Sequence, residues 1–150
     1  MRVDLVTTDA ERLACFDALK ELRPSIARET FLDDLHRMAR QGFQLAAAWE
    51  GDHVLSVAGF RPMEMFATGK ILYVDDLVTA AAHRSKGTGR ALLAFLKQHA
   101  AALGCAYLEL DSGTNRKEAH RFYVREGLES VALHFSVPLG ATTKWSEPSV

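Results

Sequence analysis

The chain has 150 residues, with 18 lysines and arginines against 19 aspartates and glutamates, and a formal net charge of −1. This length suits one domain with its own hydrophobic core, and the 48% apolar and 25% charged residues exclude a disordered, collagen-like or disulfide-stapled chain. The balanced charge argues against nucleic acid as the main partner, because phosphate binding favours a basic surplus.

Targeting segments and metal motifs are missing from the pattern. No apolar run approaches the ~18 residues that span a membrane. An acidic residue, Asp4, stands close to the first residue, and the apolar core of a signal peptide is not seen there. Cys15 and Cys105 lie in apolar segments, which is typical of buried thiols in a reducing compartment. The six histidines show no ligand spacing such as His-x-x-x-His. We therefore expect a cytoplasmic protein with no membrane partner and no metal.

The first third of the chain predicts one strand and two helices. Val3 to Val6 is a strand candidate, and Thr8 with Glu11 forms a capping box. A stripe of apolar residues from Leu13 to Leu22 predicts a helix that ends before Pro24. A second helix is predicted from a cap at Ser25 to Gly42.

The rest of the chain alternates strands with two further helices. The predicted strands are 43–49, 53–60, 71–79, 105–111 and 128–137, the first two being joined by a tight turn at 50–52. The predicted helices run from Gly87 to Gly104 and from a capping box at Asn115–Glu118 to Gly127. Together these elements predict a single α/β domain, a mixed central sheet of about six strands with four helices. Its core covers about residues 3–139, and 140–150 form a tail that Trp145 could pin down.

A glycine-rich turn carries the chemistry of the sequence. The strand Tyr73–Thr79 leads through Ala80–His83 to Arg84-Ser-Lys-Gly-Thr-Gly89 and then to a helix. Glycines let a ligand approach the backbone, and the free amides at a helix start attract phosphate oxygens. Arg84 and Lys86 add charged hydrogen-bond donors, so the ligand expected at this turn is a diphosphate. The mononucleotide P-loop pattern does not occur, and the dinucleotide pattern fails because Leu92 stands at its third glycine position.

This turn resembles the coenzyme A signature Arg-x-x-Gly-x-Gly of the GNAT superfamily of N-acetyltransferases. The segment from Asn115 to Gly127, with Phe-Tyr following the Asn, is similar to the second landmark of that family. The order of elements also matches over about residues 3–139. Within the family, Ala119–Gly127 is similar to the corresponding helix of aminoalkylphosphonate N-acetyltransferases. The resemblance implies a GNAT-like fold, acetyl-CoA as cosubstrate and transfer of its acetyl group to an amine.

The resemblance also assigns the residues that bind acetyl-CoA. The strand backbone at Leu77, Val78 and Thr79 would pair with the pantetheine arm. The turn would bind the pyrophosphate through Arg84, Ser85, Lys86, Gly87, Thr88, Gly89 and Arg90. Asn115 and Tyr123 would lie near the pantetheine and the thiol. Ala80–His83 departs from the family pattern, in which many members carry a proline and an aromatic residue there.

Direct attack of an amine on the thioester in a ternary complex requires proton transfers. The amine must first lose a proton, since an alkyl ammonium has a pKa near ~10.4. Asp75 and Asp76 are the nearest side chains for the base, and strand alternation sends them to opposite faces, so at most one faces the amine; a water relay is an equal alternative. Tyr123 is the candidate acid that protonates the departing thiolate. Strand amides near Leu77 or Val78 would meet the developing oxyanion.

Other interpretations of the same residues stay open. Tyr123 could be a core aromatic residue, and Asp75 with Asp76 a solvated pair. Besides a small-molecule acetyltransferase, a protein or peptide N-acetyltransferase and a non-catalytic acyl-CoA sensor domain fit the motif. Acceptor contacts are expected from about 22–31 and 61–70, which carry both signs of charge and leave the acceptor undefined. The last strand and Trp145 could support a homodimer.

Overall fold

The computed structural model describes residues 1–140. Its contacts divide the chain into two compact units, the first ending at Leu110 and the second beginning at Asp111. The first unit holds the sheet with most of the helices, and residues 111–140 of the second unit hold one helix, α5 (Lys117–Arg125).

The sheet of the first unit has five strands in the order β1-β2-β3-β4-β5. They are β1 (Arg2–Leu5), β2 (Gln44–Glu50), β3 (His53–Met65), β4 (Gly69–Thr79) and β5 (Tyr107–Leu110). The first four strands pair antiparallel, and β5 pairs parallel to β4. A mixed α/β fold is thereby confirmed, with one strand fewer than expected: residues 128–137 form no strand in the described part of the chain. Alternation of apolar side chains describes a strand-like segment, but a strand exists only where a neighbour supplies its hydrogen bonds.

The helices begin and end at other residues than the pattern predicts. The single helix expected before Pro24 is two helices, α1 (Asp9–Ala14) and α2 (Phe16–Leu22), which meet at Cys15. The second predicted helix begins only at Phe31, as α3 (Phe31–Ala39), and Ser25 caps nothing. The reason lies in α2, because Lys20 Nζ donates to the carbonyls of Pro24 (2.9 Å) and Ile26 (2.8 Å) and holds the chain in a turn there.

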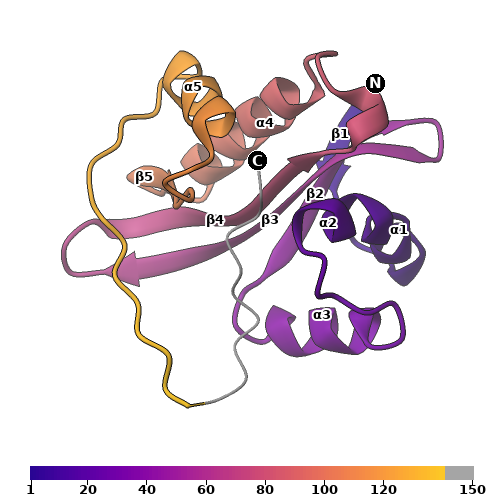
Figure 1. The fold of residues 1–150 in the computed structure, drawn as a ribbon, viewed down its shortest axis with the longest axis horizontal. Helices are drawn as coiled ribbons and strands as arrows, with labels where there is room; N and C mark the ends of the chain where they lie inside the picture. Colours follow the sequence, from indigo (N-terminus) through magenta and orange to yellow (C-terminus); the bar gives the residue numbers. More distant parts are fainter. Residues whose placement is uncertain (141–150) are drawn as a thin grey trace. The chain divides into compact units, whose positions relative to one another are not determined.

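Helices cover both faces of the sheet in the first unit (Figure 1). One apolar cluster joins α1–α3 to one face, and its strand members include Leu45, Val57 and Val78. The other cluster joins α4 (Thr88–Ala102) to the opposite face, where Phe60 and Val74 lie. Membership of one cluster or the other therefore shows on which face of the sheet the side chain of a buried strand residue lies.

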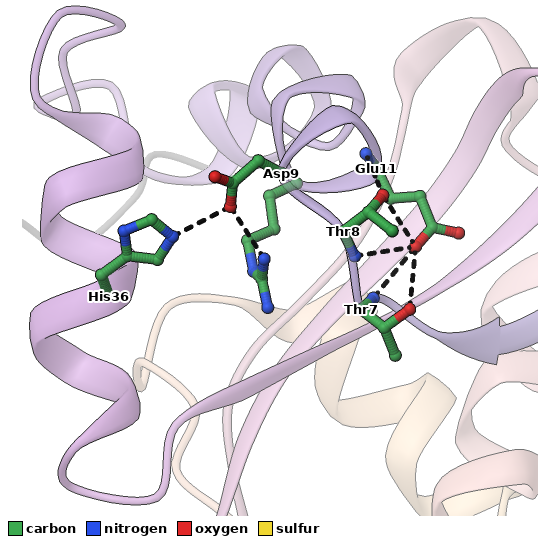
Figure 2. A network of polar contacts seen from close by, with 6 residues as sticks. Thr7, Thr8, Asp9, Glu11 and His36 are labelled. Atoms are coloured by element: carbon green, nitrogen blue, oxygen red, sulfur yellow. Dashed lines mark hydrogen bonds and ion pairs between the residues drawn. The ribbon is translucent and has the colours of Figure 1, made fainter.

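The N-terminus of α1 matches its prediction in detail. The Glu11 amide donates to Thr8 Oγ1 at 3.1 Å, and Glu11 Oε1 accepts from the amides of Thr7 and Thr8, each at 3.0 Å. Figure 2 shows this capping box beside Asp9, whose Oδ1 lies 2.9 Å from the ring Nε2 of His36 on α3. The hydrogen bond to His36, followed by that to Arg12, lowers the pKa of the Asp9 carboxyl. One exposed carboxylate therefore links α1 to α3.

Two further expectations are corrected. The N-cap of α5 is Arg116, without a side-chain cap, so the capping box at Asn115–Glu118 does not form. Residues 61–70, which lie between the predicted strands 53–60 and 71–79, are mostly strand and not a connection, because β3 continues to Met65 and β4 begins at Gly69. They form the end of the β3–β4 hairpin, where Phe66 is fully exposed.

Candidate acetyl-CoA site

A β-bulge in β4 brings the two predicted carboxylates to one face. Gly59 of β3 pairs with Asp76, but the next residue, Phe60, pairs with Val74, which leaves Asp75 as an extra residue in β4. Val74 lies in the α4 cluster and Val78 in the α1–α3 cluster, although strict alternation would put both on the same face. The prediction that alternation sends Asp75 and Asp76 to opposite faces is therefore wrong.

Two arginines hold these carboxylates, one from the neighbouring strand β3 and one from the end of α2, which is distant in the sequence. Arg61 of β3 donates to both oxygens of Asp75, from Nη2 to Oδ2 at 2.7 Å and from Nε to Oδ1 at 3.2 Å. Arg23, the C-cap of α2, donates from Nε to Asp76 Oδ1 at 2.7 Å and from Nη2 to the carbonyl of Asp75 at 3.0 Å. Arg23 therefore binds the backbone of the bulge as well as its neighbouring side chain.

Asp76 is the more enclosed of the two acids. Its Oδ2 lies against Gly59, where an added Cβ would stand 2.8 Å from this oxygen and 2.5 Å from the ring of Phe43. Burial raises the pKa of the Asp76 carboxyl above its ordinary value, and the hydrogen bond and charge of Arg23 work in the opposite direction. Glycine at position 59 is what lets the carboxylate lie here.

The strand segment predicted to bind pantetheine has an open side. β4 pairs with β5 only from Ile71 to Val74, whereas its pairing with β3 continues to Thr79. The Ala80 amide donates to Leu55 of β3 at 3.0 Å. Since backbone groups alternate in direction along an antiparallel strand, the N–H and C=O of Leu77 and Thr79 point to the side away from β3. An extended chain could add there as a further strand, and Val78, whose groups face β3, could not pair with it.

The glycine-rich turn follows directly. After Ala80 comes a short 3-10 helix, η1 (Ala81–His83), and then the turn, in which Ser85 has φ 68° and Gly87 has φ 77°. Gly87 is the N-cap of α4, and the first turn of α4 contains no acidic residue. The first N–H groups of a helix have no partner within it, so this end of α4 is a seat for an anion. Arg84 and Lys86 belong to the turn and Arg90 to the first turn of α4, so three cationic residues lie close in the chain to this helix end.

The residues present fit a diphosphate at this turn. A Cβ built on Gly87 would meet no atom within 4 Å, so the backbone is open to a ligand on that side. The hydroxyl of Thr88 is buried and has no hydrogen-bond partner among residues 1–140. Gly89 completes the small-residue pattern at the first turn of the helix.

The two remaining predicted residues belong to the second unit. Asn115 precedes α5, and its carbonyl accepts from the Lys117 amide at 3.0 Å. Tyr123 lies on α5, with its ring 5.5 Å from that of Phe122, and its carbonyl accepts from the Leu128 amide. The ring of His120, on the same helix, lies 2.7 Å from the Gly113 carbonyl and thus holds the loop before α5.

Three residues at this site have no motif that marks them. They are Arg23, Arg61 and Glu21, whose Oε1 accepts from the Ala81 amide at 2.9 Å. Arg23 and Glu21 come from α2, more than 50 residues before their partners, and only the packing of α2 on β4 brings them together. The signal available in the sequence was weak: two buried-strand acids require cationic partners somewhere in the chain.

Residues 1–140 offer neither a membrane-spanning helix nor a cluster of metal ligands. No helix there is long and apolar enough to cross a membrane. No group of three or more His, Cys, Asp or Glu side chains in that part of the chain could hold a metal ion. Cys15 is buried, which raises the pKa of its thiol to about 12 and makes it a poor nucleophile.

Comparisons with known proteins show the family of the chain. Residues 8–128 match the model of the acetyltransferase (GNAT) family. An uncharacterized N-acetyltransferase of Bacillus subtilis, YhdJ, is 34% identical over 119 residues, which cover 79% of this chain and 84% of the relative. An aminoalkylphosphonate N-acetyltransferase of Salmonella typhimurium is 33% identical over 66 residues, 44% of this chain and 43% of that protein.

A solved structure shows the same fold. The aminoglycoside N-acetyltransferase AAC(6')-Iy in complex with CoA superposes with a TM-score of 0.80 at 12% identity, covering 93% of this chain and 96% of that one. The family model extends over most of the chain and includes the glycine-rich turn, α4 and α5. The chain therefore belongs to the GNAT family of acetyltransferases and is an acetyl-CoA-dependent N-acetyltransferase.

Proposed function

We propose that the enzyme transfers the acetyl group of acetyl-CoA to the primary amine of a small molecule, by direct attack of the amine in a ternary complex. One observation carries the proposal: the open side of β4 at Leu77 and Thr79 adjoins the bulge that places Asp75 and Asp76 on one face. Acetyl-CoA supplies the acetyl group as an activated thioester. A thioester bound along this side of β4 would lie beside both a base and a strand amide.

Asp76 is the base in this proposal, alone or through a water molecule. Both oxygens of Asp75 accept from Arg61, whereas the bond from Arg23 Nε to Asp76 goes to Oδ1. A base must be able to hold a proton near working pH, and the raised pKa of Asp76 favours that role. The amide of Leu77, which points away from β3, is the donor toward the thioester oxygen.

Tyr123 is the proposed acid that protonates the departing thiolate, on the strength of the Asn115–Tyr123 motif. Replacing Tyr123 by Phe should lower kcat ~10²-fold with little change in the affinity for acetyl-CoA. Tyr107→Phe is the matched control, because Tyr107 is an exposed tyrosine on β5. Loss of affinity with unchanged kcat would assign Tyr123 to packing.

The charges around Asp75 and Asp76 bear on the acceptor. Each acid is paired with an arginine, so this face offers guanidinium groups as well as carboxylates. An amine that also carries an acidic group fits this mixture better than a polyamine, which requires uncompensated acids. The partial match to an aminoalkylphosphonate N-acetyltransferase supports the same class.

Binding of the cosubstrate is the first test. A ligand at a hundred times its Kd stabilises a protein by about 2.7 kcal/mol, which shifts the Tm of a domain of this size by several degrees. Acetyl-CoA and CoA should produce that shift, and ATP and NAD should not. The absence of any shift with acetyl-CoA would overturn the assignment of the turn.

An acceptor panel is the second test. Thiol release from acetyl-CoA would be followed with 2-aminoethylphosphonate, amino acids, glucosamine, spermidine and lysine-containing peptides. We expect the highest kcat/KM for amines with an acidic group. Acetylation of peptides with small amines untouched would instead establish a protein acetyltransferase, and tight binding without turnover a sensor domain.

A further inference from the structure

The C-terminal end of α2 bonds to the chain at two places, one in β4 and one just after it. Glu21 Oε1 accepts from the Ala81 amide at 2.9 Å, at the start of η1. Two residues later, Arg23 donates to the Asp75 carbonyl at 3.0 Å and to the Asp76 carboxylate at 2.7 Å. These contacts mark the two ends of the segment 75–81, which contains the open side of β4.

In the segment 75–79, the edge of β4 that faces away from β3 is not paired with another strand among residues 1–140. β5 ends its pairing at Val74, so among residues 1–140 the only strand that pairs with β4 from Asp75 onward is β3. A strand with one free edge and a bulge adjusts its backbone more easily than a strand paired on both edges. The bonds from α2 fix both ends of the segment whose backbone would meet acetyl-CoA.

We propose that Glu21 and Arg23 are positioning residues for acetyl-CoA: they hold the segment 75–81 in the shape that binds the pantetheine arm and leads into the pyrophosphate turn. The inference rests on the proposed placement of acetyl-CoA along β4. Neither side chain needs to touch the cosubstrate, since each acts through the backbone or carboxylate that it binds.

The geometry of the two contacts predicts which substitutions are tolerated. The Ala81 amide needs an oxygen acceptor, which a glutamine side chain also supplies, so charge at position 21 is dispensable. Arg23 makes two bonds from one planar guanidinium to two different acceptors, and a lysine ammonium cannot reproduce that fork. Glu21→Gln should therefore preserve function, and Arg23→Lys should not.

The test measures the Kd of CoA and of acetyl-CoA calorimetrically, well below the Tm of each variant. Glu21→Ala should raise both Kd values about five- to tenfold, the effect of one hydrogen bond of about 1 kcal/mol, and Glu21→Gln should stay within about twofold of the wild type. Arg23→Lys should weaken binding as much as Arg23→Met. Glu50→Ala, an exposed residue of the β2–β3 hairpin, is the matched control and should not change the Kd.

Hydrogen exchange separates positioning from general stability. In Glu21→Ala, the amides of residues 77–81 should exchange faster, while those of α4 and of β2 keep wild-type rates. A variant with a lower Tm but unchanged Kd and unchanged exchange in 77–81 would show a merely structural role and overturn the proposal. Failure of the wild type to bind acetyl-CoA would instead overturn the proposed function, so the two failures are distinguishable.

Discussion

Two opposing effects act on the pKa of the Asp76 carboxyl, and their balance has measurable consequences. Burial disfavours its charged form, whereas Arg23 favours it. Burial is the larger of the two, so the folded-state pKa lies above the value of 3.8 for an unperturbed aspartate. The unfolded chain therefore ionises first as the pH rises, and the contribution of Asp76 to the free energy of unfolding decreases with pH between 3.8 and the raised pKa.

If Asp76 is the base, its raised pKa also determines where kcat/KM rises on the acid side of the pH profile, which is called the acid limb here. The base must be ionised, so kcat/KM should rise with pH through the pKa of Asp76, with a midpoint above 3.8. Arg23→Met removes the largest influence that lowers this pKa and should move the midpoint to higher pH; Asp75 and Arg61, the other charged neighbours, are unchanged. Asp76→Asn should lower kcat/KM by ~10²-fold or more and abolish the limb.

The pH profile is checked against Asp52→Asn, an exposed acid in the β2–β3 turn, which should behave as wild type. An unchanged acid limb in Asp76→Asn would exclude this carboxylate as the base and favour the water relay.

For single residues, the sequence shows which side chains are important. It shows less readily how those side chains are arranged. Asp75 and Asp76 stand out as acids in an apolar strand, and that much is visible in the pattern. Their orientation depends on the bulge opposite Gly59 and Phe60, which arises from the register between two strands. Arg23 and Arg61 could not be assigned to them, because ion pairs between distant segments follow from packing and leave no periodic signal.

The element that binds the pyrophosphate is built from a turn and a helix start. Gly87 has a positive φ of 77°, in the region that disfavours other residues, and space beyond its Cα. Both properties also occur at Gly51 of the β2–β3 hairpin, with φ 61° and no atom within 4 Å of an added Cβ. Gly87 and Gly51 thus share a left-handed backbone with open space beside it, and of this pair Gly87 lies at the proposed site.

Replacing each of these glycines by valine separates strain from ligand contact. Both variants should be destabilised by about 1–3 kcal/mol, the cost of a side chain in left-handed backbone. Gly87→Val should in addition raise the Kd of acetyl-CoA at least tenfold, because its side chain would occupy the approach to the helix start. Thermal unfolding and calorimetric titration of both variants measure the two effects. Wild-type affinity in Gly87→Val would place the diphosphate elsewhere.

Element existence was easier to predict than element boundaries. The strands β2 and β4, the turn and α4 lie close to their predicted positions, because glycines and alternation mark them strongly. β3 begins where it was predicted but continues beyond residue 60 to Met65. The helix break at Cys15 was not predictable, since the apolar stripe continues through it. Likewise, the turn at 24–30 depends on Lys20 reaching two carbonyls, and capping patterns do not report such bonds.

At the scale of the whole molecule, the described part of the chain leaves one apolar surface without an explanation. The odd-numbered side chains from 131 to 139 are all large, apolar and 74–91% exposed, whereas the even-numbered ones are small or polar. They are Val131, Leu133, Phe135, Val137 and Leu139. Trp145, which was expected to pin down the tail, lies outside the described residues. A segment with one apolar face is typical of a strand that is covered on that face.

We expect a second copy of the chain to cover this surface, which makes the enzyme a homodimer. Burial of one such side chain contributes about 1.5–3 kcal/mol relative to leaving it in water, so a surface that carries five of them favours association with a second copy. Light scattering across a wide range of concentrations should report a dimer, and Leu133→Ser with Val137→Ser should shift it toward the monomer. Ala132→Ser, on the opposite face, is the matched control. A wild-type monomer at every concentration would show that the chain covers the segment itself.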